Sequence, residues 1–537
     1  MSSSEKAPRT MSLTQPAAIE RVFPTLSAEQ LARVAAHGEA RHVGAGQVLV
    51  DAGDSPTHFF VVTSGRLDIE NPAAHEGDLL VASVGPGQFT GDTNMLSGRR
   101  IVVRIRAGEP TDVIALTRSQ LLSLVQTDSE LSDLFVRAFL LRRVEIVAHG
   151  VGNLLLVGST ASPDTLRVQE FLGRNGHPFS YVDVDRTPDV RELLDHFEIG
   201  AADVPVVICG GTKVRKNPSN QDLASCLGFN EAIDLDRVRD VVVVGAGPAG
   251  LAAAVYAASE GLDVLVVEAY APGGQAGSSS KIENYLGFPT GISGQELAAR
   301  AFTQAQKFGA EVLIAESGVR LVPGRRPYAI LLGNGREVKA RAVVIATGAA
   351  YRKLSVENLS RFEGAGVYYA ATAVESKLCK GEDAVVVGGG NSAGQAAVFL
   401  APIVRRLHVI VRSDPAETMS RYLIRRIEES PNTVLRTQTE VVALDGADHL
   451  ERMSCRDRRT GAVEELGARH LFSMTGAVPS TEWLQEAVAL DEKGFVKTGS
   501  DLSADDLKAA RWPLALPPHL YETSLPAVFA VGDVRCG

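Results

Sequence analysis

The sequence predicts a multidomain chain in which a β-roll with helices comes first, a small α/β unit second and two larger α/β units last. Its 537 residues exceed what one hydrophobic core usually holds, since domains commonly span about 100 to 200 residues. Residues 42–117 consist of short β-rich runs separated by glycine turns, which is typical of a small antiparallel roll or barrel. Two strand-turn-helix openings follow after residue 240, about 140 residues apart.

Composition and charge exclude some classes of partner. The chain is 45% hydrophobic and 22% charged, with a net charge of −10, so it has no basic excess that would favour nucleic acid. Residues 1–17 lack the apolar core of a signal peptide, and we expect a disordered lead and a cytoplasmic protein. The apolar run 241–258 approaches the length of a membrane span, but its fixed glycine spacing favours strand, turn and helix.

The N-terminal domain is expected over residues 18–148, with a helical stretch over 118–147. Residues 150–230 then read as a β-α-β-α-β unit, with helices at 163–175 and near 188–197 and a last strand in VPVVICGG.

The first strand-turn-helix opening carries a complete dinucleotide fingerprint in DVVVVGAGPAGLAAAVYAASEGLDVLVVE. Gly245 permits the tight turn, Gly247 lets a pyrophosphate approach the backbone, and Gly250 lets helix pack on strand. Glu268 ends the next strand, where a carboxylate accepts a hydrogen bond from a ribose hydroxyl. The nucleotide contacts of the turn are expected from Gly245, Gly247, Pro248, Ala249 and Gly250.

The second opening, AVVVGGGNSAGQAAVFLA, has arginine where the first has an acid. Arg412 stands at the position of Glu268, and Arg421 follows it. An arginine there suits a 2′-phosphate, and one charge-assisted hydrogen bond would favour NADPH over NADH by roughly 10- to 100-fold. The pair of folds therefore suggests FAD and NADPH exchanging a hydride. The expected NADPH residues are Gly388, Gly390, Asn391, Ser392, Ala393, Arg412 and Arg421.

Further segments of residues 240–537 match the motifs of one family: PGGQAGSSSKIENYLGFP (272–289), VVIATGA (343–349), MTGAVP (474–479) and AVGDV (530–534). With the two glycine turns, they resemble the thioredoxin reductase-like branch of the pyridine nucleotide-disulfide oxidoreductases. The resemblance implies an FAD domain split into 238–352 and 472–537, an NADPH domain over 353–471, and a homodimer. It also implies FAD contacts from Gly273, Gly274, Gln275, Asn284, Thr347, Gly348, Gly532 and Asp533.

The redox pair of this family is absent from its usual place. Thioredoxin reductases carry C-x-x-C just before the NADPH turn, whereas this chain has Ala370 and Ala373 there. Alanine cannot accept a hydride equivalent from flavin as a dithiol. The remaining thiol candidates are Cys379, which we expect to be buried and inert, and Cys536 near the GDV turn.

The five cysteines (209, 226, 379, 455 and 536) are scattered without zinc spacing, so we expect no metal and a reduced thiol set. The sequence stops at GDVRCG, where the family usually continues with a closing helix facing the flavin. We therefore expect weaker FAD retention and weaker dimer contacts.

Residues 20–148 resemble the cyclic nucleotide-binding domain family, in GQVLVDAGDSPTHFFVVTSGRLDI and GPGQFTGDTNMLSGRR. The resemblance implies a cyclic nucleotide effector held by Gly91 and Asp92 at the ribose and by Arg99 or Arg100 at the phosphate. A vestigial roll, or one that binds a different ligand, is the alternative.

Residues 152–228 resemble a thioredoxin or glutaredoxin-like domain, with Val204-Pro205 as its cis-proline turn. The usual active cysteines are replaced by GSTASPDT. We expect a redox-silent domain in which Cys209 and Cys226 are structural.

Three functions remain open at this point. The first is an FAD- and NADPH-dependent oxidoreductase with an acceptor other than the standard thioredoxin disulfide, regulated by the N-terminal domain. The second is a diaphorase that reduces ferredoxin, flavodoxin or quinone. The third is a non-catalytic sensor in which a bound nucleotide sets a conformation that a partner protein recognises.

Overall fold

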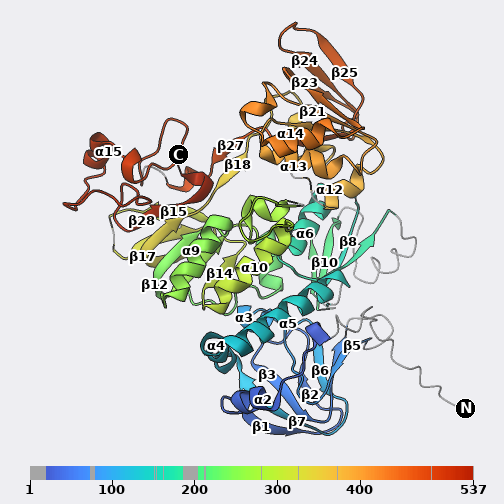
Figure 1. The fold of residues 1–537 in the computed structure, drawn as a ribbon, viewed down its shortest axis with the longest axis vertical. Helices are drawn as coiled ribbons and strands as arrows, with labels where there is room; N and C mark the ends of the chain where they lie inside the picture. Colours follow the sequence, from blue (N-terminus) through green and yellow to red (C-terminus); the bar gives the residue numbers. More distant parts are fainter. Residues whose placement is uncertain are drawn as a thin grey trace, which may run out of the picture.

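The computed structural model describes most of the chain. Its described residues are 20–72, 79–149, 152, 154–160, 162–185, 203–210, 213–279, 281–324, 326–369, 371, 373–484 and 487–535. The expected lead (1–17) and the expected helix near 188–197 lie outside them. Four folded units are visible in Figure 1, with the N-terminal roll at one end and the last α/β unit at the other.

The N-terminal domain is the antiparallel roll that the sequence predicts. Its sheets have the strand orders β1-β7-β3 and β2-β6-β4-β5. Phe59, Phe89, Phe135 and Phe139 form an aromatic cluster in its core, with ring centroids 4.8–6.4 Å apart. Its strands are β1 (Glu39–Val43), β2 (Val48–Val50), β3 (His58–Ser64), β4 (Leu67–Asn71), β5 (Leu79–Val84), β6 (Arg104–Ala107) and β7 (Thr111–Thr117).

The helices of this domain are α2 (Ala28–Ala35), α3 (Asn94–Ser97), α4 (Arg118–Thr127) and α5 (Ser129–Ala148). The helical stretch expected over 118–147 is divided at Asp128, which has an extended backbone. The Asp128 side chain accepts a hydrogen bond from Leu131 N at 3.0 Å. Asp128 is therefore both the C-cap of α4 and the N-cap of α5.

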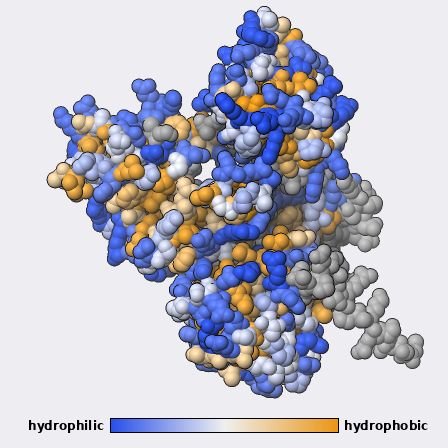
Figure 2. Space-filling view, in the orientation of Figure 1, coloured by the Kyte–Doolittle hydropathy of each residue, from blue (hydrophilic) through white to orange (hydrophobic). Residues whose placement is uncertain are grey.

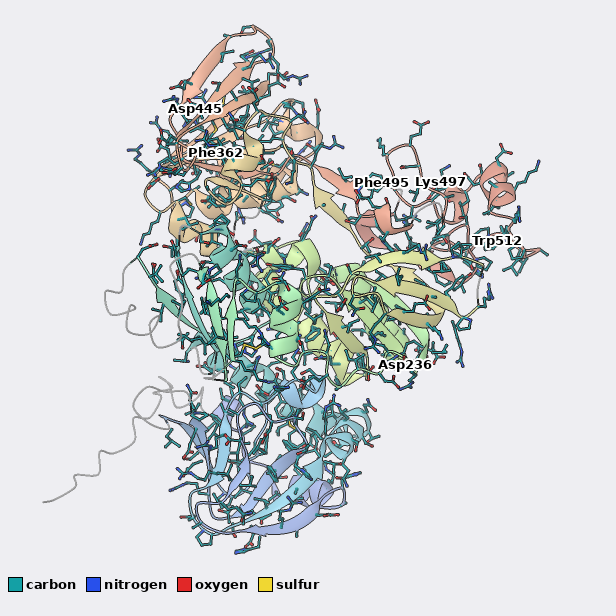
Figure 3. All side chains as sticks on the ribbon, turned by 180° about the vertical axis from the view of Figure 1, so that it is seen from behind. Asp236, Phe362, Asp445, Phe495, Lys497 and Trp512 are labelled. Carbon is teal, nitrogen blue, oxygen red and sulfur yellow. A yellow bond between two sulfur atoms is a disulfide. The ribbon has the colours of Figure 1, made fainter. Side chains whose placement is uncertain are left out.

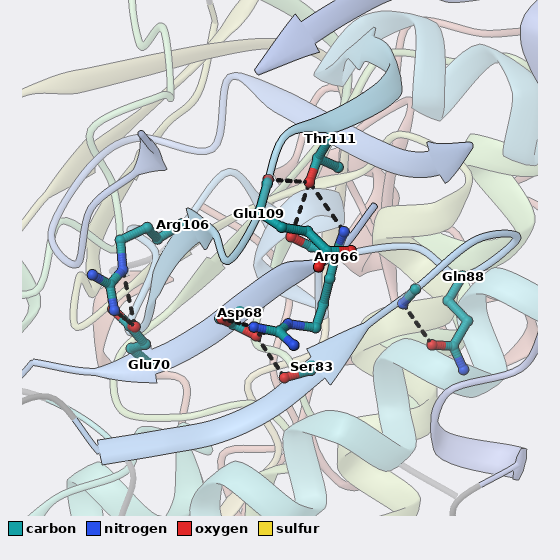
Figure 4. Close-up of polar contacts among 9 residues, drawn as sticks. Arg66, Asp68, Glu70, Ser83, Gln88, Arg106, Glu109 and Thr111 are labelled. Atoms are coloured by element: carbon teal, nitrogen blue, oxygen red, sulfur yellow. Dashed lines mark hydrogen bonds and ion pairs between the residues drawn. The ribbon is translucent and has the colours of Figure 1, made fainter. Parts of the chain in front are cut away.

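Alternation along β4 and β6 separates two faces of the roll. Ile69 and Ile105 point into the core, whereas their neighbours carry charge. Figure 4 shows the polar face, where Asp68 accepts from Arg66 (3.0 Å) and from Ser83 (2.6 Å), and Arg106 pairs with Glu70. This period of two is what leaves an apolar interior in the roll.

The small α/β domain (residues 152–228) has a sheet with the strand order β11-β10-β8-β9. β9 is parallel to β8, whereas β10 is antiparallel to both β8 and β11. Val204-Pro205 is cis, as the sequence predicts. The elements are β8 (Leu154–Gly158), α6 (Pro163–Arg174), β9 (Ser180–Asp183), β10 (Val206–Cys209), β11 (Lys213–Lys216) and α8 (Asn220–Cys226).

Two cysteines of this domain are joined. β10 and α8 both end at a cysteine, with Cα atoms 6.7 Å apart, and Cys209 and Cys226 form a disulfide. The expectation of a reduced thiol set is therefore wrong for this pair, because the fold brings together two residues that are distant in sequence.

The domain with the first glycine turn (residues 238–352 and 474–535), called the first nucleotide domain after its expected ligand, has a sheet with the order β14-β13-β12-β17-β16-β15. In this sheet β28 also pairs with β17. β12, β13, β14, β17 and β28 are parallel. The strands are β12 (Val238–Val244), β13 (Val264–Glu268), β14 (Glu311–Ile314), β15 (Gly318–Val322), β16 (Tyr328–Leu332), β17 (Glu337–Ile345) and β28 (Val528–Ala530). The helical elements are α9 (Pro248–Ser259), η2 (Gly274–Ser278), α10 (Gly294–Lys307), η4 (Glu482–Leu484) and η6 (Gly532–Val534).

The second nucleotide domain (residues 353–473) has a parallel sheet with the order β19-β26-β20-β21-β22. β26 pairs with β20 in this sheet, so the boundary expected after residue 471 falls inside a strand. A separate antiparallel sheet has the order β23-β24-β25. The strands are β19 (Val367–Tyr368), β20 (Asp383–Val387), β21 (Arg406–Ile410), β22 (Thr433–Arg436), β23 (Thr439–Asp445), β24 (Arg452–Asp457), β25 (Val463–Leu466) and β26 (His470–Ser473). The helical elements are α11 (Leu359–Phe362), α12 (Ala373–Leu378), α13 (Asn391–Leu400), η3 (Pro415–Glu417) and α14 (Arg421–Glu428).

Two short strands carry the chain between these domains. β18 (Ala349–Tyr351) leaves the first domain, and β27 (Ala477–Pro479) returns to it antiparallel. The segment after β27 includes η5 (Gly499–Asp501) and α15 (Ala504–Ala509). Figure 3, drawn from behind, shows Lys497 and Trp512 on this segment, where Lys497 pairs with Asp506 (3.0 Å) and Trp512 donates to Leu516 O (2.9 Å).

Hydrophilic residues cover most of the face in Figure 2, with smaller hydrophobic patches between them. Among the described residues, no helix combines the length and the apolar character that crossing a bilayer requires.

Candidate functional site

The first glycine turn is built for close backbone approach. Gly245 has a φ of +105°, and a Cβ there would lie 2.3 Å from Ala346 O. A Cβ at Gly250 would lie 1.9 Å from Gly245 O, so helix and strand pack without room for a side chain. Gly247 caps α9, and no side chain completes the cap. The amides at the start of α9 are thus available to an anion.

Glu268 lies beside this turn, at the end of β13. Its Oε2 accepts from Ala246 N (2.7 Å), and its Oε1 accepts from Tyr270 N (2.8 Å) and Ala271 N (3.2 Å). Burial raises the pKa of this carboxyl group, and the three backbone donors oppose that rise. A carboxylate has about four lone-pair positions, so one remains for a ribose hydroxyl.

The loop with Gly273 and Gly274 folds back onto the turn. Gly273 has a φ of +102° and donates to Ala246 O (2.8 Å). A Cβ at Gly274 would lie 2.9 Å from Gly247 Cα. Arg174 of the small α/β domain donates to Gly274 O at 2.5 Å. Sequence reasoning did not identify Arg174, because nothing local to α6 indicates that the domain packs on this loop.

The other residues expected around FAD lie at the rim of the same domain. Gln275 donates to Ala349 O, and Thr347 donates to Ser480 O (2.8 Å) where the chain crosses between domains. Asn284 is exposed. Asp533 is exposed on η6, and a Cβ at the preceding Gly532 would lie 2.8 Å from Ala249 Cβ. Gly348 has a φ of +63°. The structure therefore brings η6 to the N-terminal end of α9.

The second glycine turn repeats this construction. Gly388 has a φ of +149°, and a Cβ there would lie 2.2 Å from Met474 O. Ala393 is fully buried behind the turn. Gly390 caps α13 without any side-chain hydrogen bond, and a Cβ there would meet nothing within 4 Å. The start of α13 thus faces open space.

The two arginines stand at the same edge of the sheet. Gly388 N donates to Ile410 O (3.0 Å), which places the turn beside the segment that leads to Arg412. Ser420 N donates to Asn391 Oδ1 (2.7 Å), which ties the start of α14, and so Arg421, to the turn. Arg412 and Arg421 are exposed, and neither side chain has an ion-pair partner within the described ranges. Ser392 is exposed on the first turn of α13.

An ion pair joins the two nucleotide domains. Arg426 on α14 forms an ion pair with Glu283 of the first nucleotide domain at 2.5 Å. Lys281 contacts the same carboxylate at 2.9 Å. Hydrogen bonding to Arg426 lowers the pKa of Glu283. The pair holds the second domain beside the loop that precedes α10.

The two free cysteines within the described ranges, Cys379 and Cys455, are not placed for redox exchange. Cys379 is fully buried after α12, and burial raises its pKa to about 11. Cys455 is buried as well, and burial raises its pKa to about 11. A thiol with such a pKa has almost no thiolate at neutral pH. Ala373 begins α12, whereas Ala370 and Cys536 lie outside the described residues.

The four residues expected to hold a cyclic nucleotide do not lie together. Gly91 and Asp92 line a partly open cavity of about 70 Å³ inside the roll, but Arg99 and Arg100 do not. Arg99 donates to Asn175 O (3.0 Å), and Arg100 pairs with Glu231. The structure therefore does not bring either arginine to the expected phosphate position.

Comparison with known proteins gives the family. The profile described as "Pyridine nucleotide-disulphide oxidoreductase" matches residues 239–537, and the one described as "Cyclic nucleotide-binding domain" matches residues 40–128. The thioredoxin reductase of Bacillus subtilis (strain 168) is 30% identical over 300 residues, which cover 56% of this chain and 88% of that protein. The thioredoxin reductase of Streptomyces clavuligerus is 33% identical over 298 residues, which cover 55% and 86%.

A solved structure agrees with these matches. The thioredoxin reductase of T. acidophilum has a TM-score of 0.50 and 28% identity, covering 56% of this chain and 91% of that one. The similarity covers both nucleotide domains, where the glycine turns and their uncapped helices lie. The chain thus belongs to the pyridine nucleotide-disulphide oxidoreductase family, as a flavoprotein oxidoreductase of the thioredoxin reductase type.

Proposed function

We propose that the chain is an NADPH-dependent reductase that holds FAD in the first nucleotide domain and NADPH in the second. Electrons would leave the flavin for an acceptor other than a thioredoxin-type disulfide. The single observation that carries this proposal is the pair of uncapped helix starts on α9 and α13, each behind a glycine turn that excludes side chains. A helix start without a side-chain cap is suited to a pyrophosphate.

The residues around the two turns have separate tasks in this proposal. FAD and NADPH, when bound, supply hydride transfer. Glu268 would hold the ribose of FAD through its remaining lone pair, and Arg412 with Arg421 would hold the 2′-phosphate of NADPH. The Glu283–Arg426 pair would keep the two domains in register.

The acceptor is proposed to be reached without a protein thiol. Cys379 is buried with a raised pKa, and the sequence has no C-x-x-C before the second turn. This favours a diaphorase-type reaction with a quinone or a small redox protein. We further propose that the small α/β domain has a thioredoxin-like fold, which its strand order and cis-proline support, and that the enzyme is a cytoplasmic homodimer.

Regulation by the N-terminal domain is part of the proposal. α3 packs on α10, and α10 packs on η2. η2 belongs to the loop with Gly273 and Gly274, called the flavin loop because it is expected to contact FAD. α3 immediately follows Gly91 and Asp92 in the cavity wall. A ligand in the roll would therefore act on the flavin loop through α3 and α10.

An anaerobic titration tests the reductive half-reaction. FAD-loaded protein should lose its flavin absorbance near one equivalent of NADPH. The Gly390→Ala variant should bind FAD as the wild type does but need much more NADPH, because its methyl group occupies the space before α13. Unchanged flavin absorbance with excess NADPH in the wild type would refute the reductase and leave a nucleotide-binding sensor.

A steady-state assay tests the route to the acceptor. Quinone or dye reduction by NADPH should survive in the Cys379→Ala and Cys536→Ser variants. If either substitution abolished turnover while flavin reduction persisted, electrons would be passing through a thiol.

A further inference from the structure

The three charged residues expected to hold a cyclic nucleotide are engaged elsewhere. Asp92 forms an ion pair with Arg143 at 3.1 Å, and Arg143 also donates to Gly176 O (2.9 Å). The Arg99 guanidinium lies 4.1 Å from the Phe229 ring centroid, and Arg100 pairs with Glu231. These contacts all lead toward the small α/β domain and the segment after it. Arg99 and Arg100 thus join domains, and Asp92, which lines the cavity, is paired with Arg143.

The cavity itself is lined mainly by aliphatic side chains. Its walls come from β4, β5 and the segment before β6, with α5 on the other side. Most polar groups at the wall have partners. Thr90 accepts from Phe60 N (3.1 Å) and Asp92 pairs with Arg143. His58 Nδ1 lies 3.1 Å from Thr57 Oγ1, and Glu145 lies 3.5 Å from His149. The apolar lining includes Ile69, Val81, Ala82, Met95, Ile101 and Val103. Ribose hydroxyls and a phosphate would lose hydration there without gaining partners.

Arg142 of α5 is a buried cation in this wall. It is 4% exposed and lies between two aromatic rings, with its guanidinium carbon 4.7 Å from the Phe23 centroid and 4.6 Å from the Phe89 centroid. Its Nε donates to Val22 O and its Nη1 to Gly91 O, both at 2.9 Å. Its Nη2 is buried and has no acceptor among the residues that the structure describes. A buried cationic donor without a partner is costly unless a ligand supplies one.

We propose that this cavity binds a short apolar carboxylate, with the carboxylate on Arg142 Nη2 and the hydrocarbon chain among the aliphatic side chains. The size agrees with this class. An apolar cavity of roughly 150 Å³ admits benzene, so about 70 Å³ suits a short alkyl chain better than a purine nucleotide. The proposal does not depend on the reductase activity, because it concerns the roll alone.

Calorimetric titration of the full chain tests the ligand class. The probes are sodium propanoate, propan-1-ol and cAMP. Propanoate should bind roughly 10- to 100-fold more tightly than propan-1-ol, the range for one charge-assisted hydrogen bond, and cAMP should not displace it. Equal binding of propanoate and propan-1-ol, failure of both to bind, or displacement by cAMP would each overturn the proposal.

Variants distinguish the contribution of the Arg142 charge to binding from that of the cavity volume. Arg142→Met should reduce propanoate binding to the level of propan-1-ol, whereas Arg100→Gln, which removes the same charge outside the cavity, should leave it unchanged. Arg142 also holds Val22 O and Gly91 O, so the Arg142→Met variant can lose its fold. Ala82→Phe keeps Arg142 and fills the cavity, and should abolish binding of both probes. Retained propanoate binding in Ala82→Phe would place the ligand elsewhere and refute this site.

Discussion

Two exposed arginines decide the cofactor preference proposed for the second nucleotide domain. Arg412 and Arg421 stand at the edge of the sheet where Gly388 turns, and no described acid pairs with either side chain. Replacing both with Gln should raise the KM for NADPH by roughly 10- to 100-fold, because the 2′-phosphate loses its charge-assisted hydrogen bonds. Steady-state kinetics with each cofactor measures this change.

NADH provides the internal control for the arginine variants. It has no 2′-phosphate, so its KM should change little in the same double variant. An equal loss with both cofactors would mean that the arginines support the fold of the domain or a shared part of the nucleotide.

At the scale of the element, the two glycines of the second turn have different roles. Gly388 is needed for folding, and Gly390 for the proposed binding of NADPH. Gly388→Ala would force a Cβ to 2.2 Å from Met474 O at a φ of +149°, so the domain should lose stability by a few kcal/mol. Gly390→Ala meets nothing within 4 Å and should keep wild-type stability while losing NADPH affinity. Thermal unfolding of the apoprotein together with NADPH titration distinguishes the two, and equal melting temperatures would contradict the steric argument.

The disulfide between β10 and α8 should stabilise the small α/β domain. Closing a loop of this length, with a sequence separation of 17, contributes about 3 kcal/mol by restricting the unfolded chain. The Cys209→Ser/Cys226→Ser variant should unfold at lower denaturant concentration, and wild type treated with dithiothreitol should match it. An untreated wild type no more stable than the reduced one would show that the pair is not oxidised in solution.

The sequence predicted those elements whose signals are local. Glycine spacing after a β-branched run predicted both nucleotide turns, because only glycine tolerates the backbone contacts at Gly245 and Gly388. Tertiary partners gave no such signal. The Cys209–Cys226 pairing and the hydrogen bond from Arg174 to Gly274 O depend on how separate elements pack. Arg99 and Arg100 matched a motif, but their environment is set by another domain.

At the scale of the whole molecule, two arginine side chains, Arg99 and Arg143, join the N-terminal roll to the other domains. Arg99 donates to Asn175 O and lies against Phe229 and Phe302, while Arg143 donates to Gly176 O. Phe302 belongs to α10 of the first nucleotide domain. The roll, the small α/β domain and the first nucleotide domain therefore share one interface. The proposed regulation would use this interface to connect the roll to the Gly273–Gly274 loop.

A histidine in this interface should make it sensitive to acid. His177 is 6% exposed, and its Nε2 is buried without a hydrogen-bond partner in the described part of the chain. Burial, with the nearby Arg143 and Arg99 charges, lowers its pKa well below the usual 6.5. Below about pH 6.5 the unfolded chain therefore binds a proton that the folded chain does not. As the pH is lowered from there, the free energy of unfolding should decrease by up to about 1.4 kcal/mol per pH unit.

Denaturant unfolding between pH 7.5 and 5.5 measures this effect, with His177→Phe as the control because it keeps an aromatic ring against Phe229. The wild type should lose more stability than the variant over this range, and the difference should vanish above pH 7, where the imidazole is neutral in both states. Carboxylates elsewhere titrate alike in both proteins and cancel in the comparison. Identical pH dependence would mean that His177 is protonated in the folded protein over this range, and that the neighbouring Arg143 and Arg99 charges do not prevent this protonation.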